Sequence, residues 1–236
     1  MFEVRNIAFT YGDKPVLKDV SFVSSPGETV CVVGANGAGK TTLLKVLSTL
    51  LVPDSGSIMV DGQNALLRPL KYRRLLGYMP EAVALYEDMS VRDYLTYRAN
   101  LKGEPAKRIR RRVGEACEMC RISDLAKTPI RGLSLGLKKR VALADALLLR
   151  PRVLFLDDFL AGLDSEMRTA AGTILSDAAA FSSVVVTGHA LEDLVKWTTR
   201  FLVLKGGVIT ASIPTAGADR SVLLARVDAA LRGEAS

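Results

Sequence analysis

The chain has 236 residues, a formal net charge of +7 and a hydrophobic fraction of 49%. This length is enough for one α/β domain with a sizeable buried core, and it excludes a small scaffold that depends on disulfides or metals. No apolar run approaches the roughly 20 residues that cross a bilayer, and the N-terminus lacks a basic region followed by an apolar one, so we expect neither a membrane span nor a signal peptide. The positive charge suits anionic partners without choosing among nucleotides, nucleic acid and an acidic membrane surface.

The first predicted element is a β-strand. Residues 4–11 alternate between apolar and polar side chains, which places Ile7, Phe9 and Tyr11 on one face, and a turn follows at residues 12–15. The chain therefore begins with antiparallel β-structure.

A strand, a loop and a helix come next. Residues 29–33 form the continuous apolar run typical of a parallel strand that is buried on both faces. A glycine-rich loop follows, and then a helix over residues 42–47 that we expect Pro53 to end.

The pattern changes to helices over residues 89–131. Ser90 and Asp93 fit a capping box, in which both side chains satisfy first-turn N–H groups. Apolar strand-like runs return at residues 153–156 and 184–186, which indicates a parallel α/β topology that resumes after a helical insertion. The C-terminal part then predicts a hairpin and a short amphipathic helix.

The loop after the second strand matches the pattern G-x-x-x-x-G-K-[ST], in the strand–loop–helix context that its mechanism requires. Backbone N–H groups of such a loop curl around phosphate oxygens, and the following helix adds the positive end of its dipole. Lys40 should reach the β- and γ-phosphates, and the Thr41 hydroxyl should ligate Mg²⁺. We therefore expect ATP and Mg²⁺ to bind at Gly34, Asn36, Gly37, Ala38, Gly39, Lys40, Thr41 and Thr42.

Two aspartates follow the strand predicted at residues 153–156. Asp157 would position Mg²⁺, directly or through a water, and Asp158 could polarise the attacking water. Seen alone, an Asp pair at a strand end is more often a turn or a helix cap. The glycine-rich loop upstream favours the metal-binding interpretation.

The segment Leu-Ser-Leu-Gly-Leu-Lys-Lys-Arg at residues 133–140 precedes these aspartates, and Ala-Gly-Leu-Asp at residues 161–164 follows them. Over residues 1–210 the chain thus resembles the ATPase subunit of an ATP-binding cassette (ABC) transporter. In that family the P-loop is followed by a glutamine loop, a helical subdomain, an L-S-G-G-Q signature, the Mg²⁺-binding strand, a G-L-D loop and a histidine.

The resemblance implies an α/β fold. Its core is a RecA-like P-loop NTPase with a parallel sheet, an N-terminal antiparallel β-subdomain and an inserted helical subdomain. We expect a single ABC ATPase domain over residues 1–236, divided into a nucleotide-binding core (1–81 and 150–215), a helical subdomain with the signature (82–149) and a C-terminal helix and tail (216–236).

The resemblance also assigns roles to residues around the nucleotide. Tyr11 resembles the aromatic that stacks on adenine, or else is a packed edge-strand tyrosine. Glu81 occupies the place of the loop glutamine that touches Mg²⁺ and the attacking water, or else is a surface carboxylate. His189, the single histidine of the chain, resembles the switch histidine that contacts the γ-phosphate, although such a residue at a strand end is otherwise structural.

Three further residues are implied to act across a dimer. Ser134 and Gly136 would face the γ-phosphate of ATP held by a second subunit, with the helix N-terminus aimed at the charge. Alone, Ser134 would be an ordinary N-cap. Asp164 matches the aspartate that communicates across the dimer, or else it is a helix cap.

The sequence departs from the family at three positions that bear on the mechanism. Leu135 and Leu137 replace a glycine and the glutamine of the signature, which together with the Gly-Tyr-x-Pro-Glu pattern ending at Glu81 resembles an export-type branch whose permeases are separate chains. Asp158 stands where the family usually has glutamate, so its carboxylate is withdrawn by about 1 Å, and displacements of that size can cost about 100-fold in rate. We therefore expect slow hydrolysis with near-normal ATP binding.

The leading hypothesis is an ATP-hydrolysing subunit that forms a homodimer or heterodimer and energises a separate membrane permease, as an exporter. It would lie at the cytoplasmic face of a bacterial inner membrane, with no nucleic-acid partner expected. One alternative is a slowly hydrolysing regulatory subunit of a heterodimeric complex. Another is a soluble ABC ATPase, which typically carries coiled-coil insertions or paired ATPase domains.

Overall fold

The computed structural model describes residues 1–233, so the last three residues of the predicted C-terminal tail (216–236) lie outside the described part. Its strands are β1 (Phe2–Tyr11), β2 (Lys14–Ser24), β3 (Thr29–Val33), β4 (Ser55–Val60), β5 (Gln63–Asn64), β6 (Leu76–Met79), β7 (Val153–Leu156), β8 (Ser183–Thr187), β9 (Arg200–Lys205) and β10 (Val208–Pro214). Its helices are α1 (Lys40–Leu47), α2 (Pro69–Arg73), α3 (Val91–Leu101), α4 (Ala106–Met119), α5 (Leu135–Leu147), α6 (Ser165–Ala179), α7 (Leu191–Leu194) and α8 (Arg220–Arg232), with two 3-10 turns, η1 (Ser123–Leu125) and η2 (Ile130–Gly132).

The strands form one ten-stranded sheet in the order β5-β4-β1-β2-β10-β9-β3-β8-β7-β6. Neighbouring strands from β6 through β7, β8 and β3 to β9 pair in parallel, as predicted for the core. The pairs β1–β2, β1–β4 and β4–β5 are antiparallel, which confirms the antiparallel β-structure expected at the N-terminus. A single parallel pair, Val208 with Asp19, joins β10 to β2 and so links the two parts of the sheet.

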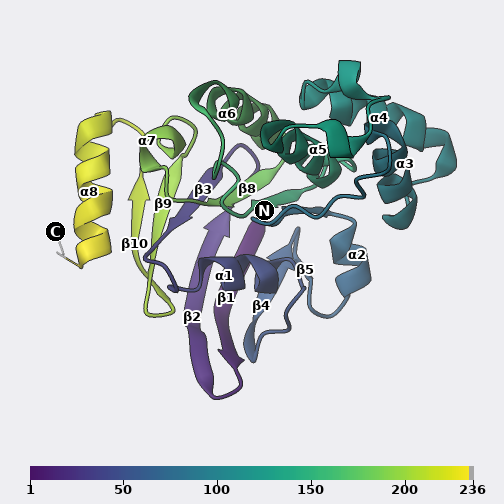
Figure 1. The fold of residues 1–236 in the computed structure, drawn as a ribbon. Coiled ribbons are helices and arrows are strands. Elements are labelled where there is room, and N and C mark those ends of the chain that lie inside the picture. The colour runs from purple at the N-terminus through teal and green to yellow at the C-terminus, as the bar shows by residue number, and fades with distance from the viewer. Residues whose placement is uncertain (234–236) are drawn as a thin grey trace.

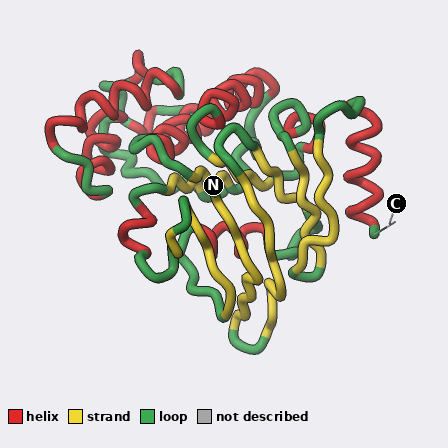
Figure 2. The backbone as a smooth tube through the Cα atoms, turned by 180° about the vertical axis from the view of Figure 1, so that it is seen from behind, coloured by secondary structure: helices red, strands yellow, loops and turns green. Residues whose placement is uncertain are grey.

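The parallel strands are covered on both faces. In β3, Cys31 and Val33 belong to the core cluster that contains α3 to α6, whereas Val30 and Val32 belong to the cluster under α1. All residues of β3, β7 and β8 are buried, which explains the apolar runs that these strands contain. In Figures 1 and 2 the helices α3 to α6 gather on one side of the sheet, and α8 lies beside β9 and β10.

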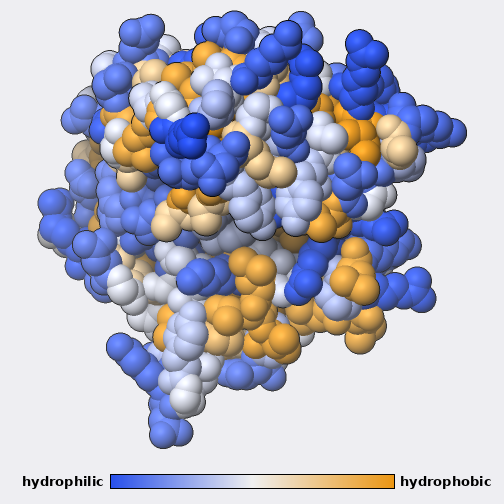
Figure 3. Space-filling model, turned by 45° about the vertical axis from the view of Figure 1, so that its right-hand side comes forward, coloured by the Kyte–Doolittle hydropathy of each residue, from blue (hydrophilic) through white to orange (hydrophobic). Residues whose placement is uncertain are grey.

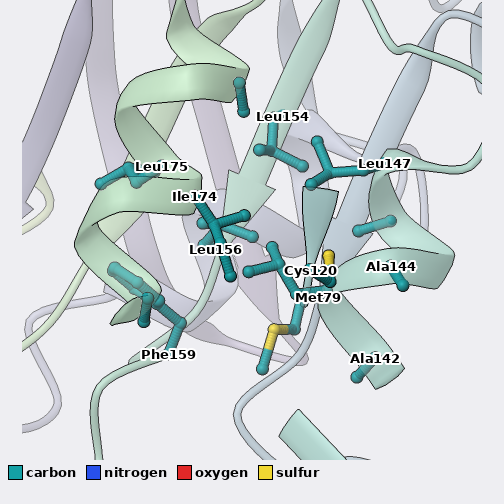
Figure 4. Close-up of a cluster of buried hydrophobic side chains, with 14 of the residues drawn as sticks. Met79, Cys120, Ala142, Ala144, Leu147, Leu154, Leu156, Phe159, Ile174 and Leu175 are labelled. Carbon is teal, nitrogen blue, oxygen red and sulfur yellow. The ribbon is translucent and has the colours of Figure 1, made fainter. Parts of the chain in front are cut away.

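The larger core cluster ties the helices to the sheet. In Figure 4, Leu154 and Leu156 of β7 lie among Leu147 of α5 and Ile174 of α6. All four side chains are fully or almost fully buried. Burial of one such aliphatic side chain contributes about 1.5–3 kcal/mol, so this layer fixes α5 and α6 against β7.

Two local predictions need correction. The helix after the glycine-rich loop begins at Lys40 and ends at Leu47, well before Pro53, because the chain turns away through Thr49, whose φ is +58°. At the start of α3, Ser90 Oγ accepts from the Asp93 N–H at 3.2 Å, as predicted. The Asp93 carboxylate, however, accepts from the Ser90 hydroxyl at 2.6 Å rather than from a backbone N–H, so only half of the capping box forms.

A buried ion cluster joins α3 to α5. Asp145, only 7% exposed, pairs with Arg98 at 2.9 Å and with Lys102 at 2.7 Å. Burial by itself would raise the pKa of Asp145, but Lys102 and Arg98 more than offset that effect and hold the pKa below its usual range. The folded state therefore favours the ionised carboxylate.

Replacing Asp145 with asparagine is expected to lower the free energy of unfolding at pH 7 by about 3 kcal/mol, because it leaves two partly buried cations without their counter-charge. Since the folded-state pKa is lowered, the wild-type advantage is fully present above the unfolded value of 3.8 and should disappear as pH falls through the folded-state value. Urea unfolding of both proteins between pH 7 and pH 3 measures this. Asp228→Asn, at an exposed position of α8, is the control, and an equal loss in both variants would contradict the cluster's role.

Candidate nucleotide-binding site

The glycine-rich loop lies between β3 and α1, where the sequence places it. Gly39 is the N-cap of α1 with a φ of +103°, a conformation that L side chains rarely adopt. A Cβ at Gly34 would lie 2.4 Å from the carbonyl oxygen of Leu204, so the strand can enter the loop only through glycine. The loop thus presents backbone N–H groups at the positive end of a helix, which is an anion-binding arrangement.

A cleft of about 390 Å³ opens above this loop. It collects most of the residues predicted from the sequence, namely Tyr11, Asn36, Gly37, Gly39, Lys40, Thr41, Thr42, Glu81, Asp157, Asp158 and His189. Gly34 and Ala38 belong to the same loop but do not line the cleft. Residues from five separate segments therefore meet at the carboxyl ends of the parallel strands.

Lys40 extends across the loop. Its Nζ donates to the carbonyl oxygens of Gly34 at 2.8 Å and Ala35 at 3.0 Å. Burial lowers the pKa of Lys40, while Asp158 and Asp157 act in the opposite direction and favour the charged form. The ammonium is thus held between the loop backbone and the two carboxylates.

Asp157 is almost completely buried at 2% exposure. Its Oδ1 accepts from the Thr187 hydroxyl at 2.6 Å and from the Thr41 hydroxyl at 3.2 Å. Its Oδ2 is also buried and has no hydrogen-bond partner within residues 1–233. A buried carboxylate oxygen without a partner, next to a threonine hydroxyl, fits the oxygen ligands that Mg²⁺ requires.

Asp158 has a left-handed backbone, with a φ of +41°. Asp and Asn tolerate this region better than other side chains that carry a Cβ. The Asp158 N–H donates to Thr187 Oγ1 at 3.0 Å, and the same hydroxyl donates to Asp157. Thr187, the last residue of β8, therefore orients both aspartates. This role was not predicted from the sequence, although Thr187 directly precedes Gly188 and His189.

Three of the predicted residues form the rim of the cleft. Tyr11 is 46% exposed, unlike the buried Ile7 and Phe9 of the same predicted face, and its ring lies edge-on to Phe9 at 4.8 Å between centroids. Glu81 and His189 are exposed and follow the ends of β6 and β8. Their side chains are available to a ligand in the cleft.

The signature residues and Asp164 lie outside the cleft. Ser134 is the N-cap of α5 and accepts from the Leu137 N–H at 3.3 Å, while Asp164 is the N-cap of α6 and accepts from the Met167 N–H at 2.8 Å. Both cap residues are exposed, and a Cβ at Gly136 would lie 3.0 Å from Met167 Sδ. Ser134 and Asp164 therefore both act as helix caps, as the alternative interpretations predicted. Within residues 1–233, neither of these two side chains lines the cleft.

A family model described as "ABC transporter" matches residues 17–161, more than half of the chain. The chain belongs to this family. This ABC subunit is an ATPase of the P-loop type, and the ten-stranded sheet with its inserted helices is the family fold.

Similar proteins include ABC subunits from several bacteria. YxlF of Bacillus subtilis, named an uncharacterized ABC transporter ATP-binding protein, is 32% identical over 89% of this chain and 70% of YxlF. The sulfate/thiosulfate import protein CysA of Methylococcus capsulatus is 35% identical over 88% of this chain and 61% of CysA. The Nod factor export ATP-binding protein I of Burkholderia orbicola is 34% identical over 87% of this chain and 68% of that protein. The ABC subunit thus spans less than two thirds of some relatives.

Solved structures agree with this assignment. An ATP-binding subunit of an ABC transporter superimposes with a TM-score of 0.83 at 27% identity, covering 97% of this chain and 99% of that one. The cbiO1 protein of Clostridium perfringens, part of the transporter complex cbiONQ, gives a TM-score of 0.83 at 26% identity, covering 98% of this chain and 94% of that one. None of the helices within residues 1–233 is long and apolar enough to cross a membrane.

Proposed function

We propose that this ABC subunit binds MgATP in the cleft and hydrolyses it to drive an export permease carried on a separate chain, at the cytoplasmic face of a bacterial inner membrane. The observation that carries the proposal is the convergence of Lys40, Asp157, Asp158 and His189 on one cleft. A phosphate cradle, a metal carboxylate and a candidate base in one place are the parts that phosphoryl transfer to water requires.

Each part has a chemical role in hydrolysis. The loop N–H groups and Lys40 hold the phosphates and stabilise the charge that develops on them. Thr41 and Asp157 would hold Mg²⁺, which when bound neutralises phosphate charge. Asp158 accepts the proton of the water that attacks the γ-phosphorus, and the bond from that phosphorus to the β–γ bridging oxygen breaks and releases ADP. Glu81 and His189 orient the water and the γ-phosphate from the rim.

The exposed signature supports a second subunit. Ser134 lies at the N-terminus of a 13-residue helix, and Asp164 lies nearby at the start of α6. Both are separate from the chain's own cleft, so each is free to meet the nucleotide or the G-L-D loop of another subunit, in a homodimer or a heterodimer. On this proposal the ATP site is complete only between two subunits.

The helical insertion offers a surface for the permease. A groove on this part of the chain is lined by Leu85, Tyr86, Glu87, Asp88, Met89 and Tyr97. Tyr86 is 52% exposed, and its ring lies 5.6 Å from that of Tyr97. Exposed aromatic rings suit the apolar face of an amphipathic helix of a membrane protein. The carboxylates of Glu87 and Asp88 already pair with Lys138 at 2.6 Å and with Arg131 at 3.3 Å, so the aromatic rings carry this part of the proposal. Figure 3, which brings the side with α2 and α3 forward, shows hydrophobic groups interrupting a hydrophilic surface.

Export is the finer part of the proposal. The relatives include the import protein CysA and a Nod factor export protein, so sequence similarity alone does not distinguish import from export. Leu135 and Leu137 in the signature, together with Glu81 after Pro80, support the export-type branch. The cytoplasmic location follows from the requirement for ATP and for a permease partner.

Truncating both tyrosines, Tyr86→Ala with Tyr97→Ala, is expected to reduce recovery of the permease about tenfold, because exposed aromatics at an interface centre carry much of its binding energy. The measurement is affinity purification of the tagged chain, co-expressed with a polytopic membrane protein where a neighbouring gene encodes one. The control is Leu101→Ala, which changes an exposed residue at the end of α3, the helix that contains Tyr97. ATP hydrolysis by the isolated subunit should be unaffected. Failure of the wild type to retain any membrane protein would favour a soluble ABC ATPase.

A further inference from the structure

A lysine is buried in the helix that follows the signature. Lys139 lies on the second turn of α5, at 6% exposure. Lysine is almost never fully buried unless its ammonium has partners. Its partners therefore indicate why it occupies this position.

Those partners are in the segment that follows Asp158. Lys139 Nζ donates to the carbonyl oxygen of Ala161 and, at 3.4 Å, to that of Phe159. These carbonyls lie between Asp158 and Asp164, in a turn where the Ala161 N–H donates to the Asp158 carbonyl oxygen at 3.0 Å. A side chain of the signature helix thus fixes the short loop that connects the candidate base to the next helix.

The same ammonium acts on the charges of the cleft. Burial lowers the pKa of Lys139, while Asp158 and Glu81 act in the opposite direction and favour the charged ammonium. The cleft contains the carboxylates of Asp157, Asp158 and Glu81, and Lys40 faces all three. Lys139 supplies a further positive charge from behind the loop.

The start of α5 packs against this loop at other points as well. A Cβ at Gly162 would lie 3.2 Å from the Leu135 side chain, and Arg140 lies 3.4 Å from Met167 Sδ. With Lys139, these contacts join the signature helix, the loop after Asp158 and the start of α6. The loop that follows Asp158 is therefore packed directly against α5.

We propose that Lys139 is a positioning residue for hydrolysis: its buried amino group anchors the loop after Asp158 to the signature helix and balances the negative charge of Asp158 and Glu81. It touches neither nucleotide nor water. The inference rests on the proposed role of Asp158 as the base.

The test compares Lys139→Met, which keeps the length of the side chain but removes the charge and the donor, with the wild type. We expect kcat to fall about tenfold or more, because small displacements of a catalytic group are costly, with the KM for ATP changed less than about twofold. Amide hydrogen exchange of residues 159–164 should accelerate. Leu143→Met, a buried change one turn further along α5, controls for packing and should leave both measurements unchanged.

A second variant separates positioning from structural support. In a Glu81→Gln background the excess negative charge is smaller, so Lys139→Met should cost kcat at least about threefold less than in the wild-type background. Equal losses in both backgrounds, or unchanged kcat and exchange in Lys139→Met, would overturn the inference. If the wild type itself fails to hydrolyse ATP, the proposed function fails instead, and the exchange measurement still decides whether Lys139 anchors the loop.

Discussion

Replacing Asp158 with asparagine is expected to lower kcat by about 10²- to 10⁴-fold, the usual contribution of a general base. Asparagine keeps the size of the side chain and tolerates the left-handed backbone of this position, where φ is +41°. The N–H that donates to Thr187 also remains, so the loop should keep its conformation. Single-turnover phosphate release measures the loss, and binding of a fluorescent ATP analogue should change less than about twofold.

Asp158→Glu decides between a cycling ATPase and a slowly hydrolysing regulatory subunit. If the short side chain of Asp158 limits the rate of hydrolysis in the wild type, glutamate should bring the carboxylate closer to the attacking water and raise kcat. Displacements near 1 Å can change a rate by about 100-fold. Glutamate gains this reach against the strain of a positive φ. A wild type that already turns over near the common rate of about 10 s⁻¹ would contradict the regulatory interpretation. An Asp158→Asn variant with unchanged kcat would remove Asp158 from the mechanism.

The parallel core could be predicted because a strand that is buried on both faces of the sheet has apolar residues at consecutive positions. Residues 29–33, 153–156 and 184–186 are unbroken apolar runs, and each is a buried parallel strand. Polar residues that directly follow such strands must meet at one edge of the sheet, which is why Asp157, Asp158 and His189 line one cleft. The apolar strands of the core therefore made it possible to predict where most of the site residues lie.

The roles of other site residues cannot be recognised from the hydrophobic periodicity of the sequence. Thr187 is one more β-branched residue in a strand, and only the register Leu156 with Val186 places it beside Asp157. Lys139 lies in a run of basic residues that suggests a solvated face, yet the packing of α5 on the loop at Phe159 buries it. Both roles depend on contacts between segments far apart in the chain. Sequence spacing alone does not encode such contacts.

Replacing Lys40 with alanine is expected to reduce ATP turnover by at least about 10²- to 10³-fold, the loss measured when one preorganised phosphate- or oxyanion-stabilising donor is removed. Lys40 spans the loop to the carbonyls of Gly34 and Ala35, so the truncation also releases the loop that shapes the phosphate cradle. ATP affinity should therefore fall together with kcat, unlike in Asp158→Asn. Steady-state hydrolysis and titration with the fluorescent ATP analogue measure both quantities.

The matched control is Lys14→Ala, which removes the same charge from the same cleft without touching the loop. If Lys40 acted only through the general positive potential of the cleft, the two variants would lose similar affinity, and each loss would shrink as salt screens the field. A direct contact with the phosphates predicts a loss at Lys40 that greatly exceeds the loss at Lys14 and persists at high ionic strength. Ordinary ATP-dependent activity in Lys40→Ala would contradict the assignment of the cleft as the hydrolytic site.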